Sequence, residues 1–152
     1  MKLGLMNKNE CINFVEFNIT GTNERYNKCD DESLFLNANI FNIFVGCFER
    51  SNHLFDTVGS ALFDIRKIIP LKNELDANRE NLTLIESIDE FKNYITGIFL
   101  GKDLIIDLAK ADPLWKQRWK FYLRRLVVIN RELIALVDRC IEEEKILWFI
   151  GY

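Results

Sequence analysis

Six apolar residues recur at every seventh position after Asp31, and this spacing constrains the possible folds more than any other feature of the sequence. A period near 3.5 residues held this long is typical of a helix that packs one face against partner helices. The pattern predicts one helix over residues 32–69, capped by Asp30 or Asp31. The six residues, which we expect to be mostly buried, are Leu34, Phe41, Phe48, Phe55, Leu62 and Ile69.

Two glycines and a polar pair interrupt this predicted helix. Gly46 and Gly59 each cost about 1 kcal/mol relative to alanine inside a helix, and Ser51 and Asn52 lie between them. A kink or break near the polar pair is therefore the alternative to a continuous helix. The unshifted seven-residue period favours continuity, and Pro70 is expected to end the helix because proline lacks a backbone N–H.

A second helix is predicted over residues 83–111, after a polar connection. Thr83 and Glu86 have the spacing of a capping box, in which each side chain accepts a hydrogen bond from the other residue's backbone N–H. Apolar residues then recur at helical spacing, although Gly97 and Gly101 weaken the helix near its middle.

A third helix is predicted over residues 113–145. Asp112 and Pro113 mark the clearest boundary in the chain, because aspartate is a good N-cap and proline suits the first helical position. One face of this helix is expected to be buried through Trp115, Trp119, Tyr122, Leu126, Ile129, Leu133, Leu136 and Cys140.

The first 30 residues have a different pattern. Val15 and Phe17 alternate with Glu16 and Asn18, which predicts a short strand closed by a glycine. The chain before this strand is expected to pair with it as a hairpin that turns across residues 7–10. A helix over residues 9–17 is the competing interpretation.

Together these elements predict an all-α fold, an antiparallel bundle of three long helices with a small N-terminal strand or hairpin. A chain of 152 residues is expected to form a single domain over residues 1–152. The apolar tail at residues 146–152 is expected to dock on the bundle or on a partner. A homodimer that buries Trp148 and Phe149 would cover apolar surface that three helices leave open.

Positive charge is concentrated in residues 113–131, which contain six cations and no acidic residue. The whole chain carries a formal charge of −3, so the rest of it carries −9. Four of the cations share one side of the third helix, which we expect to be exposed, and we call Lys116, Lys120, Arg124 and Arg131 the basic stripe. The other two are Arg118 and Arg125, and all six cations are candidate residues for binding a protein partner or nucleic acid.

Three interpretations of the basic stripe are open. A row of cations beside aromatic rings can hold a phosphate backbone while nucleic-acid bases stack on the rings. Alternatively, Trp115, Trp119 and Tyr122 are core residues and the cations only flank them in solvent. In the third interpretation the surface contacts a protein partner, since arginine and tryptophan are enriched at protein interfaces.

No pattern in the sequence fixes a chemistry. There is no glycine-rich phosphate loop and no Gly-x-Ser-x-Gly, and the four cysteines and one histidine lack the spacing of a zinc site. We therefore expect no metal, no cofactor and no enzymatic activity. Cys47 and Cys140 are expected to be buried free thiols, which suits a reducing compartment.

Arg50 and His53 suggest one further hypothesis. HEPN ribonucleases, which are helical bundles, use an arginine and a histidine separated by about four to six residues on one helix. Here two residues separate the pair, so the spacing departs from that class, and a structural histidine is the simpler interpretation. A HEPN-like ribonuclease is the third functional hypothesis.

The sequence favours a non-enzymatic binding protein of the adaptor, inhibitor or immunity type, which acts through a protein–protein surface. A nucleic-acid-binding module is the alternative. The chain shows neither a signal-peptide pattern nor a run of about 20 apolar residues, so we expect a cytoplasmic location and no membrane partner. Abundant Asn, Ile, Lys and Phe are typical of an AT-rich genome, such as that of a bacterium or phage.

Overall fold

The computed structural model describes residues 1–8 and 13–152 and combines helices with an antiparallel sheet. The prediction of an all-α bundle is therefore wrong. The strands are β1 (Phe14–Asn18), β2 (Leu34–Asn37), β3 (Gly59–Phe63) and β4 (Leu147–Gly151). The helices are α1 (Ala38–Phe41), α2 (Val45–Ser51), α3 (Ile65–Thr83), α4 (Ile88–Thr96), α5 (Gly101–Ala111) and α6 (Trp119–Glu142).

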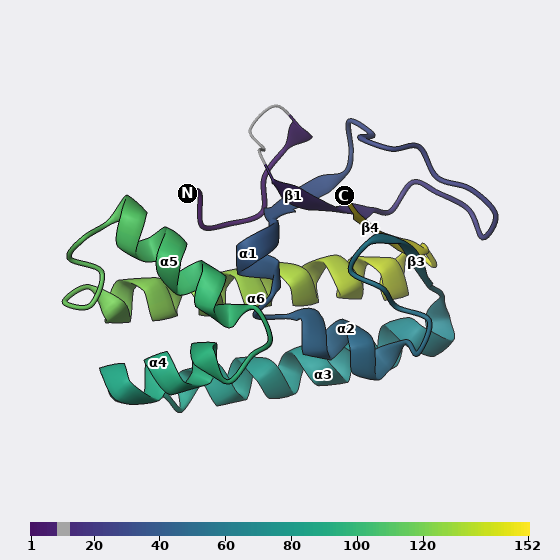
Figure 1. Cartoon of the computed structure of the whole chain (residues 1–152). Helices are drawn as coiled ribbons and strands as arrows, with labels where there is room; N and C mark the ends of the chain where they lie inside the picture. Colours follow the sequence, from purple (N-terminus) through teal and green to yellow (C-terminus); the bar gives the residue numbers. More distant parts are fainter. Residues whose placement is uncertain (9–12) are drawn as a thin grey trace.

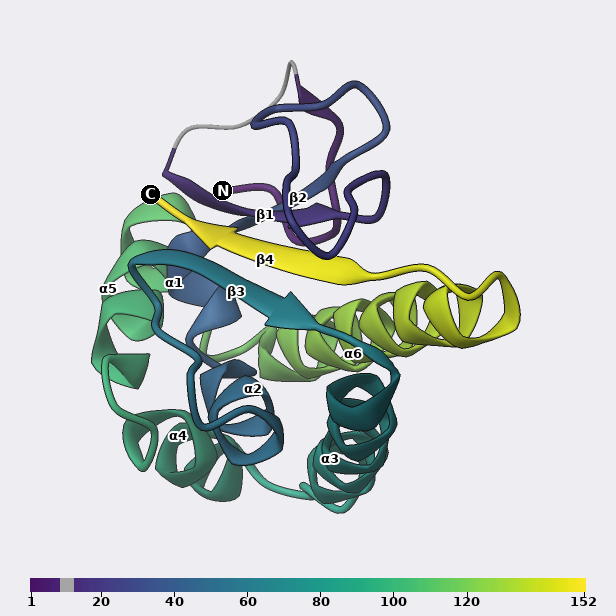
Figure 2. The ribbon, with the colours of Figure 1, turned by 90° about the vertical axis from the view of Figure 1, so that its right-hand side faces the viewer.

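The sheet separates two layers of the molecule (Figure 1 and Figure 2). The helices lie on one side of it, and the loop of residues 19–33 lies on the other. The strand order is β2-β1-β4-β3, and all neighbours are antiparallel. Strand β4, yellow in Figure 2, thus joins β1 to β3.

The apolar tail at residues 146–152 supplies this central strand and packs inside the chain. Phe149 is fully buried, and its ring centroid lies 4.9 Å from that of Phe41 and 4.8 Å from that of Phe55. Phe17 and Phe48 complete the cluster, at 6.0 and 5.8 Å from Phe149. This aromatic cluster connects the helix-facing side of the sheet to α1 and α2.

The strand predicted from alternation near the N-terminus is confirmed as β1. Its helix-facing residues, Val15 and Phe17, belong to the core, as alternation along a strand requires. The predicted hairpin turn across residues 7–10 and the alternative helix over residues 9–17 lie partly outside the described residues. Within them, Met6 forms a bridge to β2 rather than to β1.

The single helix predicted over residues 32–69 is wrong, because that stretch forms β2, α1, α2, β3 and only the beginning of α3. Its seven-residue period has no single structural cause, since strands direct side chains inward at a period of 2 and helices at 3.6. Phe41 and Phe48 are nevertheless buried, whereas Phe55 is half-buried and Ile69 is exposed.

The predicted helix breaks where the sequence carries helix-disfavouring residues. Asn52 is the C-cap of α2, and its side chain accepts a hydrogen bond from Leu54 N (3.0 Å) and donates one to Leu62 O (3.1 Å). Gly59 begins β3 with a φ of +102°, in the left-handed region that residues with a Cβ avoid. The chain therefore adopts the alternative, a break next to Ser51 and Asn52.

Pro70 does not end a helix but lies inside α3, which covers the predicted polar connection. The Asp64 carboxylate caps this helix by accepting a hydrogen bond from Arg66 N at 3.1 Å. Pro70 is exposed and removes only one backbone donor. The opposite side of α3 faces the core through Ile68, Leu71, Leu75 and Leu82.

A turn at residues 97–100 divides the helix predicted over residues 83–111 into α4 and α5. A capping box is present, but four residues later than predicted. Ser87 Oγ accepts a hydrogen bond from Glu90 N at 3.1 Å, and Glu90 Oε2 accepts one from Ser87 N at 3.3 Å. Thr83 is instead the last residue of α3.

The boundary at Asp112 and Pro113 is confirmed, but the helix predicted over residues 113–145 is shorter, since a turn precedes α6. Among the helices of the described residues, none is both long and apolar enough to cross a bilayer. Trp119 is half-buried, and the other side chains predicted for the buried face of this helix are buried: Trp115, Tyr122, Leu126, Ile129, Leu133, Leu136 and Cys140.

The aromatic cluster generates a stability prediction. Phe48→Ala removes a ring that contacts both Phe41 and Phe149, and it should lower the free energy of unfolding by about 3–5 kcal/mol in urea titrations. Leu54→Ala is the matched control, since Leu54 is 80% exposed and its truncation should change the value by about 0.5 kcal/mol or less. Equal midpoints for the two variants would contradict the packing described here.

Candidate functional site

The basic stripe lies in the turn before α6 and along that helix as far as Arg131, and its four side chains are all exposed. Leu126 and Leu133 lie on the opposite face of α6 and are buried in the core. Within the part of the chain that the structure describes, none of the four cations forms an ion pair. The stripe therefore carries uncompensated positive charge.

Arg118, the fifth cation of this segment, is held by Asp112. Its Nη1 lies 2.9 Å from Asp112 Oδ2, which also accepts a hydrogen bond from the Tyr122 hydroxyl at 2.8 Å. The Tyr122 hydrogen bond, the Leu114 N–H and the Arg118 guanidinium together hold the pKa of Asp112 below its ordinary value. This cluster fixes the turn that carries Lys116.

Arg125, the sixth cation, is half-buried and fastens the N-terminal segment. Its Nε donates a hydrogen bond to Leu3 O at 3.1 Å, and its Nη2 donates a second one to the same oxygen. Glu132, two turns further along the same face of α6, accepts a hydrogen bond from Leu5 N at 3.3 Å. The sequence pattern predicted Arg125 to be a binding residue. It could not reveal this contact, because Leu3 is more than 100 residues away along the chain.

Two apolar side chains lie exposed beside the stripe. Leu114 is 56% exposed and Phe121 is 41% exposed, and the Arg118 guanidinium lies 5.3 Å from the centroid of the Phe121 ring. Lys120 Nζ similarly lies 5.8 Å from the ring centroid of Trp119, whose other contacts include Phe91 of α4. Cations over rings and partly exposed apolar residues are typical of protein-binding surfaces.

The structure does not place Arg50 and His53 on one helix. Arg50 lies in the last turn of α2, and its Nε is bonded to Glu74 Oε2 at 2.6 Å. This bond raises the pKa of Arg50. His53 follows the helix and is exposed. The one-turn relation on which the ribonuclease hypothesis depended is therefore absent.

A pocket of about 320 Å³ opens between α2 and the end of α4. Tyr94 donates a hydrogen bond to Asn78 Oδ1 at 2.6 Å, and Asn78 in turn donates to the buried Asn130 at 2.8 Å. Burial raises the pKa of Tyr94, and it raises the pKa of Cys47, which also lines the pocket, to about 12. A protonated thiol is a poor nucleophile, so burial lowers the reactivity of Cys47.

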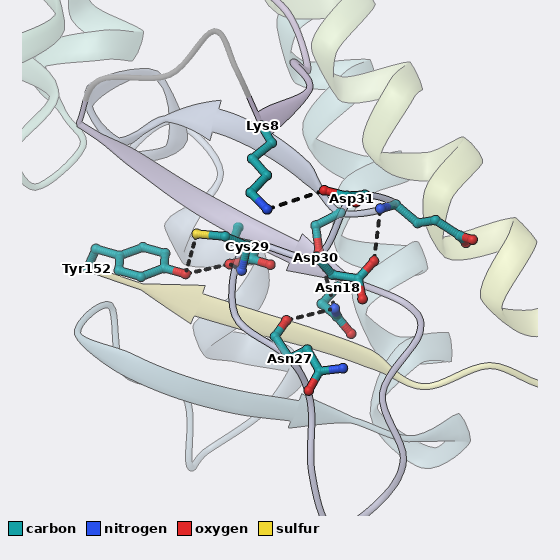
Figure 3. Close-up of polar contacts among 10 residues, drawn as sticks. Lys8, Asn18, Asn27, Cys29, Asp30, Asp31 and Tyr152 are labelled. Atoms are coloured by element: carbon teal, nitrogen blue, oxygen red, sulfur yellow. Dashed lines mark hydrogen bonds and ion pairs between the residues drawn. The ribbon is translucent and has the colours of Figure 1, made fainter.

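A second polar cluster lies on the outer side of the sheet, around buried Glu16. Figure 3 shows Asn18, Cys29 and Tyr152 of this cluster. Glu16 Oε2 accepts hydrogen bonds from Cys29 N at 3.0 Å and from the Tyr152 hydroxyl at 2.5 Å. Asn18 donates to Ser33 Oγ at 3.2 Å, and Trp148 donates to the same loop. These bonds fasten the loop of residues 19–33 to the sheet. Sequence reasoning missed them because only the fold brings the two strands and the loop together.

The residues predicted to form a dimer interface lie in β4. Phe149 has no exposed surface, and Trp148 is half-buried against Tyr26, with ring centroids 4.8 Å apart. In the described residues, no group of three or more His, Cys, Asp or Glu side chains is placed to hold a metal ion. Comparison of the chain with protein-family models, with curated proteins and with solved structures found no match.

The cysteines provide a test of the packing around the pocket. Cys47 and Cys140 are confirmed as buried free thiols, and burial raises the pKa of Cys140 to about 11. Alkylation of the folded protein near pH 8, followed by peptide mass spectrometry, should modify half-buried Cys29 but neither of these two. The same reaction in urea, the control, should modify all four cysteines of the chain. Native-state modification of Cys47 as fast as Cys29 would contradict the burial described.

Proposed function

We propose that this protein is a non-enzymatic binding protein, of the adaptor, inhibitor or immunity type, that recognises an acidic surface of a protein partner through the basic stripe. The observation that carries the proposal is a row of four exposed cations without ion-pair partners among the described residues, in a chain with a net charge of −3. Like charges on one helix repel each other, and an acidic partner replaces that repulsion with attraction.

Leu114 and Phe121 support a protein rather than a small anion as the partner. Both are exposed beside the cations, so a partner gains apolar contact as well as charge neutralisation. Protein interfaces combine an apolar centre that contains aromatic and arginine side chains with a polar rim.

Nucleic acid is the weaker alternative, for a reason visible in the packing. A single-strand platform requires exposed ring faces on which bases stack. Trp115 and Tyr122 are buried and Trp119 packs on Phe91, so these three rings act as core residues. Phosphate contacts alone would give binding without sequence preference.

The buried free thiols Cys47 and Cys140 suit a reducing compartment, and we place the proposed activity in the cytoplasm. Both side chains are buried, and among the described cysteines neither forms a disulfide bond. The proposed partner is therefore expected in the same compartment.

Charge reversal at the stripe tests the proposal. The double variant Lys120→Glu with Arg124→Glu should lose capture of a stoichiometric protein partner from cell extract. With the purified partner, its association rate should fall at least about tenfold and its dissociation rate should change less, because rim charges act mainly on encounter. The free energy of unfolding should change by about 0.5 kcal/mol or less, since both side chains are exposed.

The matched control is Arg25→Glu with Lys28→Glu, which removes the same charge from exposed positions on the other side of the sheet. This control should capture the partner normally. Loss of capture in both variants would show that net charge rather than the stripe matters. Binding of a single-stranded RNA homopolymer, lost in the Lys120→Glu and Arg124→Glu variant with a reduced salt dependence, would replace the protein partner by nucleic acid.

A further inference from the structure

The pocket of about 320 Å³ between α2 and the end of α4 combines apolar walls with polar and charged groups. Ile43 and Val45 border it on one side, and Ile98 and Phe99 border it from the turn after α4. Small-molecule sites usually have volumes of about 300–1,000 Å³, and a few polar groups among apolar walls orient the ligand. None of the residues that line this pocket belongs to the basic stripe.

Most polar groups of the pocket already have partners inside the chain. Tyr94 donates a hydrogen bond to Asn78 Oδ1 at 2.6 Å, and Asn78 donates to Asn130 Oδ1 at 2.8 Å. Asn130 donates in turn to Leu75 O at 2.8 Å, which fixes the direction of these bonds because a carbonyl oxygen only accepts. Cys47 Sγ donates to a backbone oxygen of α3 at 3.6 Å. These donors are occupied, so a ligand has to be recognised by other groups.

Arg50 is one group with hydrogen-bonding capacity left. Its Nε donates to Glu74 Oε2 at 2.6 Å, whereas its two Nη atoms have no partner within the described residues. The guanidinium lies over Gly46, one turn earlier on α2, where a Cβ would come within 2.8 Å of Nη1. Gly46 thus leaves room for the guanidinium beside the pocket. Paired N–H groups of an arginine bind a carboxylate through two parallel hydrogen bonds.

Glu49, the residue before Arg50, supplies the opposite charge. It is exposed on the rim of the pocket, and among the described residues its carboxylate forms no ion pair. The hydrogen bond to Glu74 is the main cause of the raised pKa of Arg50, and the charge of Glu49 adds to it. The pocket therefore presents a cation and an anion side by side, next to apolar walls.

We propose that this pocket binds a free α-amino acid with an apolar side chain. Its carboxylate accepts hydrogen bonds from the Nη atoms of Arg50, its ammonium group donates to Glu49, and its side chain packs beside Phe99. A singly charged ligand is attracted by one of the two neighbouring charges and repelled by the other, whereas a zwitterion is attracted by both. A peptide terminus carries only one of these charges, so a free amino acid fits better than a chain end.

The exposed turn after α4 supports an apolar side chain in the ligand. Phe99 is 87% exposed, and exposed apolar surface of this kind often marks a ligand-binding groove. Leu100 has a φ of +63°, a left-handed conformation that leucine rarely adopts. A Cβ at Gly101 would lie 1.9 Å from Ile95 O, so this turn packs closely against α4. The turn therefore presents Phe99 at the rim in a defined position.

NMR titration of the isotope-labelled full chain with L-phenylalanine tests the proposal. Amide signals around the pocket should shift with a dissociation constant of about 0.05–1 mM, as expected for a ligand of this size in an open pocket. Phenethylamine lacks the carboxylate and phenylpropionate lacks the ammonium group, and each should bind at least about threefold more weakly. The absence of shifts at about 10 mM phenylalanine would overturn the proposal, as would equally tight binding of either analogue.

Two substitutions assign the charged contacts. Arg50→Gln should weaken phenylalanine about threefold to tenfold and should not weaken phenethylamine, which has no carboxylate. Glu49→Gln should weaken phenylalanine by a similar factor and should not weaken phenylpropionate. Glu80→Gln, which neutralises an exposed carboxylate on α3, is the matched control and should leave all three dissociation constants unchanged.

Thermal unfolding of each variant verifies that it is folded. Arg50 also bonds Glu74, so Glu49→Gln, which breaks no ion pair, keeps the test decisive if Arg50→Gln loses stability. An equal loss of all three ligands in Glu49→Gln would contradict the assigned contacts, and so would unchanged phenylalanine binding in that variant.

The proposed partner-binding activity and this ligand site fail separately. The variant Lys120→Glu with Arg124→Glu leaves the pocket intact and should bind phenylalanine as the wild type does. Glu49→Gln leaves the basic stripe intact and should still capture the acidic partner.

Discussion

The pairing of β4 between β1 and β3 is the constraint on which the rest of the structure depends. Without residues 147–151 the sheet would separate into the β1–β2 pair and an isolated β3, because no other strand joins them. Phe149 connects the sheet to the helical layer through its contacts with four other phenylalanine rings. Because strand pairing satisfies the backbone donors and the aromatic contacts remove apolar surface from water, one short segment determines both layers.

The two faces of the sheet are completed by different kinds of interaction, and this difference leaves particular surfaces free. The inner face packs against the helices through apolar contacts, which hold α6 in place and leave the basic stripe in solvent. The outer face is covered by a polar loop that Glu16 and Asn18 fasten through hydrogen bonds. The basic stripe and the turn between α4 and α5 are therefore surfaces that the core neither needs nor covers.

The candidate site was only partly predictable, and Arg118 and Arg125 show why. Helical spacing placed Lys120, Arg124 and Arg131 on the exposed side of α6 correctly, because exposure on a surface helix follows from the opposite face being apolar, whereas Lys116 lies in the turn before the helix. The same spacing carries no information about what lies opposite a cation in space. Arg118 is bonded to Asp112 across a turn, and Arg125 to Leu3 from the other end of the chain. Phe99 likewise falls within the helix predicted over residues 83–111, whereas the structure places it in the turn between α4 and α5, where its side chain is exposed.

The sequence by itself determined β1, the boundary at Asp112, most of the buried face of α6 and the burial of Cys47 and Cys140, since each follows from local periodicity or capping. It did not determine the course of residues 32–69. There the seven-residue period favoured a helix, and the residues of β3, Gly59–Phe63, include no β-branched side chain that would favour a strand. Only the tertiary structure decided between them: β3 forms because residues 147–151, more than 80 positions later, offer an edge with which it pairs. A strand forms its hydrogen bonds with a partner that can be distant in the sequence, so its own residues are not enough to predict whether it forms.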